Sequence, residues 1–258
     1  MILTLTTSVR GVATLTLNRP EKHNALSEAM MVALTEAAHE IGTRDDIRVV
    51  ILAAEGPSFC AGGDLQWMME QIKADRSTRR AGAHRLAGML EALNTLPKPL
   101  IGKVHGNAFG GGVGLACVCD VAIGVTGARF GLTETRLGLV PATIGPYVVA
   151  RMGEAMARRV FMSSRVFGAE EAVMLGVIAR AVDPEALDAA IEAEVVPYLS
   201  CAPKAVAAAK VMARGLGAPI TQAEIIRSVD SLMEIWEGEE AAAGLAAFFG
   251  KTQAPWVK

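Results

Sequence analysis

The sequence predicts an α/β fold with a helical C-terminal third, and two observations carry this prediction. In the first half, short runs rich in Val, Ile, Leu and Thr are separated by a stretch of helical periodicity. After about residue 145, helix-forming segments follow one another. Strands that alternate with helices indicate βαβ units, whose largely parallel sheet is buried on both faces.

The predicted strands are short and bounded by turn residues. Residues 1–7 lack the basic start and the long apolar run of a signal peptide, so they predict a first strand. Gly, Pro or Asn follows each of the later runs. These later strands are Val12–Leu17, Val49–Ala54, Leu100–Val104 and Val121–Val125.

One amphipathic helix is expected between the second and third strands. Met30, Leu34, Ala37 and Ile41 repeat at helical spacing and form its apolar stripe. Ser27 stands where an N-cap belongs.

The C-terminal third reads as a series of helices, several opened by Pro or closed by Gly. We expect a core over residues 1–195 and a helical oligomerisation region over residues 196–258, with no low-complexity linker between them. These helices pack either against the sheets or against another subunit. They are predicted over residues 154–161, 169–175, 184–200, 203–214, 222–236 and 241–249.

Composition narrows the class of protein. The chain has 258 residues, 52% of them hydrophobic, and a net charge of -2, which is an ordinary globular profile with no sign of nucleic-acid binding. Its apolar stretches are too short to span a membrane, so a cytoplasmic location is expected. No metal site is predicted, because neither the His nor the Cys spacing matches one. The cysteines are expected to be small buried residues: Cys60, Cys117, Cys119 and Cys201.

A glycine run and a carboxylate are the strongest candidates for a catalytic site in this sequence. Three glycines, Gly110 to Gly112, leave peptide N–H groups uncovered before an apolar helix, whose dipole helps to hold an oxygen that gains negative charge. Glu134 follows in residues 130–135 and would carry the proton.

Other interpretations of the glycine run differ in strength. Glycines before an apolar helix also occur where the helix simply packs tightly, and this alternative stays open for the run alone. A dinucleotide fingerprint counted from Gly110 fails, because Leu115 takes the last position and no acidic residue follows about twenty positions on. No G-x-x-x-x-G-K-[ST] phosphate loop occurs.

A second glycine segment, residues 58–65, follows the Val49–Ala54 strand. If the N–H groups of Gly63 and Gly111 converge, they form a two-donor oxyanion hole suited to a thioester carbonyl that becomes an enolate. The alternative is a plain strand-to-helix turn capped by Asp64.

Together these motifs resemble the enoyl-CoA hydratase/isomerase family, also called the crotonase superfamily. The resemblance implies a spiral of ββα units with a helical C-terminal trimerisation region. It also implies an acyl-CoA thioester as substrate, no cofactor, and a homotrimer or a homohexamer built as a dimer of trimers. The matching segments are residues 17–20, 24–26, 59–65, 97–99, 110–112, 119–120, 130–131 and 137–138.

The resemblance also implies roles for individual residues. Gly63 and Gly111 would form the oxyanion hole, with Glu134 as the catalytic carboxylate. Trp67, Met68 and Tyr147 would be walls of the acyl pocket, although apolar core is the default for Trp67 and Met68. The expected contacts of coenzyme A are Lys22, Ala25, Ala61, Gly63, Asp64, Leu65, Gly111, Phe248 and Lys251, the last at a basic position that approaches the phosphates in relatives.

One position departs from the family pattern. Typical hydratases carry a first glutamate two places after the glycine triplet, where this chain has Gly114. The single glutamate resembles monofunctional isomerases and, more closely, bacterial hydratases of 3-methylglutaconyl-CoA or isohexenylglutaconyl-CoA. The second group shares the sequence pattern of residues 134–147, and we therefore predict that this protein hydrates a branched glutaconyl-CoA. Arg136 receives no role.

Three alternatives to this hydratase prediction stay open. They are an isomerase that uses one glutamate, a catalytically weak coenzyme A binder, and a serine peptidase on the related spiral fold. The peptidase is disfavoured because no G-x-S-x-G elbow occurs.

Overall fold

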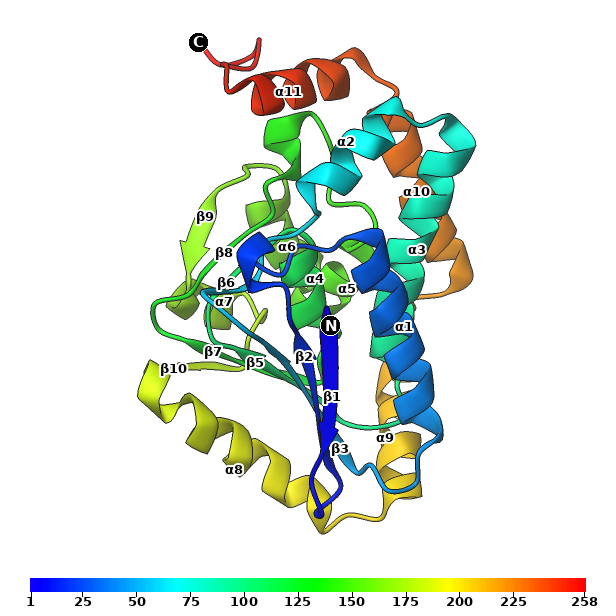
Figure 1. Cartoon of the computed structure of the whole chain (residues 1–258), viewed down its shortest axis with the longest axis vertical. Helices are drawn as coiled ribbons and strands as arrows, with labels where there is room; N and C mark the ends of the chain where they lie inside the picture. Colours follow the sequence, from blue (N-terminus) through cyan, green and yellow to red (C-terminus); the bar gives the residue numbers. More distant parts are fainter.

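The computed structural model describes residues 1–258 and places two sheets among surrounding helices (Figure 1). The larger sheet has the strand order β1-β2-β3-β5-β7-β10, and the smaller has the order β4-β6-β8-β9. The larger sheet consists of β1 (Leu3–Thr7), β2 (Val12–Leu17), β3 (Val49–Ala54), β5 (Leu100–Val104), β7 (Val121–Val125) and β10 (Arg180–Val182). The smaller consists of β4 (Ser58–Cys60), β6 (Asn107–Phe109), β8 (Arg129–Gly131) and β9 (Val166–Gly168).

Successive strands alternate between the two sheets and then lead into a helix. β3 passes to β4 and then to α2 (Leu65–Lys73) and α3 (Arg76–Thr95), and β5 passes to β6 and then to α4 (Gly111–Val118). β7 and β8 lead to the short 3-10 helix η2 (Glu134–Leu137) and to α5 (Gly145–Met152). The expected spiral of ββα units is confirmed.

The four later strands predicted from sequence have the predicted bounds. β2, β3, β5 and β7 run parallel to one another, while β1 pairs with β2 as an antiparallel hairpin. Parallel strands covered on both faces lose the alternation of apolar and polar residues, and β5 is accordingly buried at four of its five positions.

The first helix, α1 (Glu28–Thr43), begins where the sequence indicated. The amide of Met30 donates to the Ser27 hydroxyl over 3.3 Å, which confirms the N-cap. The buried face differs slightly from the predicted one, because Ala38 is buried and Ala37 is only partly so.

The long helix α3 was not among the predicted elements. Its buried face consists largely of small residues such as Gly82, Ala83 and Ala87, which give a weak hydrophobic signal along the sequence. Such small residues allow another helix to approach closely, and α10 (Gln222–Trp236) packs against Ala83 and Ala87.

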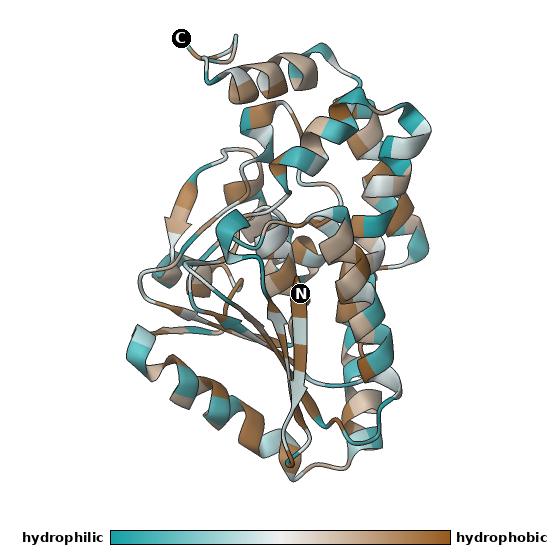
Figure 2. Cartoon of the chain, in the orientation of Figure 1, coloured by the Kyte–Doolittle hydropathy of each residue, from teal (hydrophilic) through white to brown (hydrophobic).

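The C-terminal third is helical, as predicted. Figure 2 shows hydrophobic and hydrophilic residues mixed along α8 (Leu187–Leu199), which buries Leu187, Ile191 and Val195 and packs against the larger sheet. The predicted division after residue 195 falls inside α8, and the separation into a core and an oligomerisation region stays a prediction. The remaining helices are η1 (Pro20–Lys22), α6 (Glu154–Phe161), α7 (Ala169–Met174), η3 (Pro184–Ala186), α8 (Leu187–Leu199), α9 (Pro203–Leu216), α10 (Gln222–Trp236) and α11 (Glu239–Gly250).

The last two helices fold back onto their own chain. α10 buries Ile225, Val229 and Met233 against α3, and α11 buries Ala241 and Leu245 against the segment after η2. By contrast, α9 buries no residue. None of the helices combines the length and the apolar character that a bilayer crossing requires.

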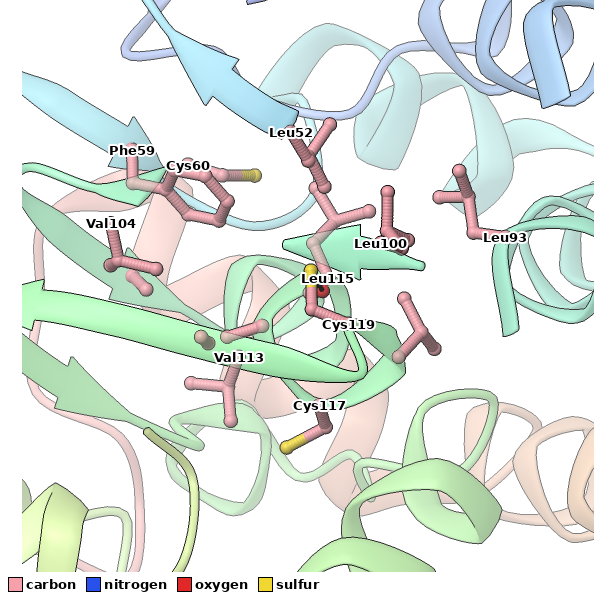
Figure 3. Packing of buried hydrophobic residues seen from close by; sticks show 14 of the residues in the cluster. Leu52, Phe59, Cys60, Leu93, Leu100, Val104, Val113, Leu115, Cys117 and Cys119 are labelled. Carbon is pink, nitrogen blue, oxygen red and sulfur yellow. Dashed lines mark hydrogen bonds between the residues drawn. The ribbon is translucent and has the colours of Figure 1, made fainter. Parts of the chain in front are cut away.

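The main core lies between the sheets and α4. Figure 3 shows Val113, Leu115 and Cys117 of α4 and the adjoining Cys119 packed among residues of β3, β4 and β5. Burial raises the pKa of the Cys60, Cys117 and Cys119 thiols to about 12, so these cysteines behave as small apolar residues. Cys201 is exposed, which corrects its predicted burial.

Candidate active site

The segment before α1 is bound tightly to the second glycine segment. The buried Asn24 donates through Nδ2 to the carbonyl oxygens of Glu55 and Ser58, over 2.8 and 2.9 Å. The amide of Ala61 donates to the His23 carbonyl, and the amide of Leu26 donates to the Gly62 carbonyl over 2.7 Å. These bonds fix the path of the backbone on both sides of the glycines.

Gly63 is left with a free amide by this arrangement. Leu26 forms a parallel bridge with Gly63, and the amide of Asp64 donates to the Leu26 carbonyl, but the Gly63 N–H makes no hydrogen bond within the protein. Asp64 caps α2 by accepting from the amides of Gln66 and Trp67. Its other oxygen lies 3.0 Å from the Arg19 guanidinium. The capped turn is confirmed, and it also leaves an amide free, as the predicted oxyanion hole requires.

The glycine triplet lies directly beside this turn. A Cβ placed on Gly62 would be 3.7 Å from the Gly111 amide nitrogen, and one on Gly112 would be 2.3 Å from the Cys60 carbonyl oxygen. Only glycine permits the second contact. Gly111 begins α4, and the first amides of a helix have no acceptor within it. Tight packing and free amides therefore occur together.

Glu134 begins η2 with its carboxyl group buried. Its Oε1 lies so near Gly110 that a Cβ there would be 3.0 Å away, and its Oε2 is buried without a hydrogen-bond partner. Burial disfavours the charged form and raises the pKa of Glu134 from 4.5 to about 7. Such a carboxyl group exchanges protons readily near neutral pH.

Gly63, Gly111 and Glu134 together line an inner cavity of about 110 Å³. An outer groove of about 290 Å³ meets it at Gly63, which lines both. The groove brings together the predicted coenzyme A contacts Lys22, Ala25, Ala61, Asp64 and Leu65. The other residues of the cavity are Leu26, Met31, Trp67, Met68, Leu86, Leu139, Val140, Pro141, Thr143, Ile144, Leu232 and Trp236.

Three predicted site residues are not brought to this cavity or groove. Tyr147 lies in the core and lines a different cavity with Asp120 and Arg151, so its prediction as an acyl-pocket wall is corrected. It sits on α5, and its hydroxyl donates to the Ala87 carbonyl of α3 over 3.4 Å. Phe248 and Lys251, at the end of α11, line neither the cavity nor the groove of their own chain.

Arg136, which received no role, turns away from the cavity. Its guanidinium donates to the Ser164 carbonyl over 3.2 Å.

Most of the residues that line the cavity were not predicted from sequence, among them Leu232, Trp236, Thr143 and Ile144. Leu232 and Trp236 come from α10, far along the chain, while Thr143 and Ile144 lie just before α5. No local pattern marks them. Ile144 fills the space beside Gly114, since a Cβ on Gly114 would lie 2.7 Å from Ile144 Cγ2.

Comparison with known proteins agrees with this geometry. The family model described as enoyl-CoA hydratase/isomerase matches residues 7–258. The enoyl-CoA hydratase ACTT6 of Alternaria alternata is 33% identical over 240 residues, covering 92% of this chain and 78% of its own. The mitochondrial methylglutaconyl-CoA hydratase of Mus musculus is 31% identical over 176 residues, covering 67% of this chain and 55% of its own.

Solved structures give the same result. Pseudomonas aeruginosa AtuE superposes with a TM-score of 0.82 at 34% identity, over 100% of both chains. With a match along almost its whole length in sequence and in structure, this chain belongs to the enoyl-CoA hydratase/isomerase family.

Proposed function

We propose that this protein is an enoyl-CoA hydratase that adds water across the double bond of a 2-enoyl-CoA. One observation carries the proposal: Gly63 lies where the outer groove meets the inner cavity, with Glu134 inside. A thioester whose coenzyme A lies in the groove and whose acyl chain enters the cavity has its carbonyl at Gly63. The amides of Gly63 and Gly111 then donate to the oxygen as it becomes an enolate.

Glu134 moves the protons in this reaction. With a pKa of about 7, it is ionised in a large fraction of molecules at neutral pH and accepts a proton from water. The same group, once protonated, returns a proton to the α-carbon.

We further propose a branched glutaconyl-CoA as the substrate. The support is the sequence pattern around Gly114 and Glu134 and the 31% identity to methylglutaconyl-CoA hydratases. The cavity adds a constraint, because Glu134 is its only ionisable residue. The distal carboxylate of such a substrate must therefore lie beyond the cavity walls, in solvent or against another subunit.

A four-substrate comparison tests the substrate class. 3-Methylcrotonyl-CoA has the branch without the carboxylate, and glutaconyl-CoA has the carboxylate without the branch. We expect kcat/KM to be highest for 3-methylglutaconyl-CoA or a longer homologue and lowest for crotonyl-CoA. A value for crotonyl-CoA equal to the highest one would reject the branched glutaconyl assignment while leaving hydration in place.

The single glutamate also favours a second candidate, an isomerase. One carboxylate is enough to move a proton between carbons two and four of a 3-enoyl-CoA. Double-bond migration without hydration of any 2-enoyl-CoA would establish it. Binding of acyl-CoA without turnover of either kind would identify a coenzyme A binder.

We propose that the chain assembles as a homotrimer or as a hexamer of two trimers. The support is α9, which buries nothing and exposes Val211, Met212 and Leu216 at 64%, 65% and 80%. Large exposed apolar groups on one helix are typical of an interface between subunits. In such an assembly, Lys251 and Phe248 would act on the coenzyme A of a neighbouring subunit.

A further inference from the structure

The acyl cavity contains only two side-chain oxygen-bearing groups, those of Glu134 and Thr143. Ten of its fifteen lining residues are hydrophobic. Trp67 presents its six-membered ring to the cavity, with Cζ3 near Gly63 and Cζ2 near Gly82 of α3. The indole N–H of Trp67 is buried and unpartnered on the α3 side.

Both oxygen-bearing groups lack a partner within the protein. Thr143 is 6% exposed, and its hydroxyl makes no hydrogen bond to any protein group. Glu134 Oε2 is buried and equally unpartnered. Buried polar groups are almost always hydrogen-bonded, and a water molecule in the cavity can supply the partner that Glu134 Oε2 lacks. The cavity of about 110 Å³ has room for one.

A residue at position 114 cannot supply the second contact to this water. Gly114 has no side chain, and Ile144 Cγ2 and Cβ lie 2.7 and 3.1 Å from the place of its missing Cβ. Thr143, which directly precedes Ile144, is the only residue of the cavity wall besides Glu134 that has a hydroxyl or carboxyl group.

We propose that the Thr143 hydroxyl holds the nucleophilic water against Glu134, a role that rests on the proposed hydratase function. One water hydrogen passes to the Glu134 carboxylate, and the other is held by Thr143 Oγ1. The water oxygen forms a bond to carbon three, and the electron pair of the double bond moves to the thioester oxygen at Gly63 and Gly111. The proton on Glu134 then goes to carbon two, and the hydroxyl stays on carbon three.

The experiment separates holding water from moving protons. Hydration of the best 2-enoyl-CoA needs both, whereas exchange of the α-hydrogens of butyryl-CoA in D2O needs only Glu134 and the two amides. Thr143→Val removes the hydroxyl and keeps the shape, and Thr143→Ser keeps the hydroxyl. Thr133→Val is a matched control, because Thr133 makes no side-chain cap bond and lies outside the cavity.

For Thr143→Val we expect kcat of hydration to fall roughly 10- to 100-fold, with KM and α-hydrogen exchange within about twofold of wild type. Thr143→Ser should restore most of the hydration, and Thr133→Val should behave as wild type. Unchanged hydration in Thr143→Val, or an equal loss of hydration and exchange, would overturn the role of Thr143 alone. Exchange without hydration in the wild type would instead overturn the proposed function, and the water contact with it.

Discussion

At the scale of single residues, burial raises the pKa of Glu134 to about 7, and both the proposed proton transfer and the stability of the fold depend on this carboxyl group. We expect Glu134→Gln to lower kcat by about a hundred- to ten-thousand-fold, because the amide keeps the volume but accepts no proton. Steady-state kinetics with the best acyl-CoA checks this, with circular dichroism and coenzyme A affinity as controls for folding and binding. Near-normal kcat would remove Glu134 from the mechanism.

The raised pKa of Glu134 also predicts the pH dependence of stability. The folded state holds this proton up to a pKa of about 7, whereas the unfolded chain releases it near 4.5, so the unfolding free energy falls as pH rises between these values. Glu134→Gln has no charge to bury, and above about pH 8 it should unfold with a free energy higher by on the order of 3 kcal/mol.

Denaturant unfolding of both proteins across this pH range checks the prediction. The difference between them should shrink toward about pH 4.5. A difference that does not depend on pH would show that burial of the Glu134 charge is not its cause. For the wild type, kcat/KM should rise with pH through a pKa of about 7.

The backbone amide of Gly111 can be separated from its small size. Gly111→Pro removes the N–H at the first position of α4, where proline is tolerated, and should lower kcat about a hundred- to a thousand-fold. Gly111→Ala keeps the N–H but adds the Cβ that would lie 2.6 Å from Leu26 Cδ1, at the movable end of that side chain. Equal activities of the two folded variants would reject the amide as an oxyanion donor.

At the scale of elements, the packing of α4 against the turn before α5 leaves no room for a second glutamate side chain at position 114. Gly114→Glu alone should lose about 1–3 kcal/mol of unfolding free energy, because its Cβ collides with Ile144. Gly114→Glu combined with Ile144→Gly removes the collision and should hydrate crotonyl-CoA faster than the wild type. Thermal unfolding and crotonyl-CoA kinetics of both, with Ile144→Gly as the control, check this. Full stability of Gly114→Glu would contradict it.

At the scale of the whole molecule, α9 should join subunits. Sedimentation is expected to give a mass three or six times the 27.0 kDa of the chain. Val211→Glu should shift the mass toward the monomer, while Val9→Glu, at a fully exposed turn, should not. A stable monomer of the wild type at micromolar concentration would exclude this assembly.

The wall of the acyl cavity is also a property of the whole molecule. Leu232 and Trp236 reach it because α10 folds back along α3 of the same chain. The C-terminal region therefore lines the proposed acyl cavity and also carries the proposed interface.

The sequence alone determined the features that local chemistry encodes. The strands β2, β3, β5 and β7 follow from runs of branched apolar residues ended by turn residues, and α1 follows from its stripe and the Ser27 cap. The glycine segments and Glu134 were recognisable because a free amide and a proton carrier need particular residue types.

Only the tertiary structure decided which side chains meet. Tyr147, chosen as a pocket wall, lines another cavity, while Thr143 and Ile144 on the preceding turn line the same cavity as Glu134. Helix α3 was not predicted because much of its buried face consists of small residues, of which Ala83 and Ala87 pack against α10. Local periodicity reports that a residue is buried, but its neighbours in the cavity depend on how elements distant in sequence cross, and no short stretch of the chain contains that information.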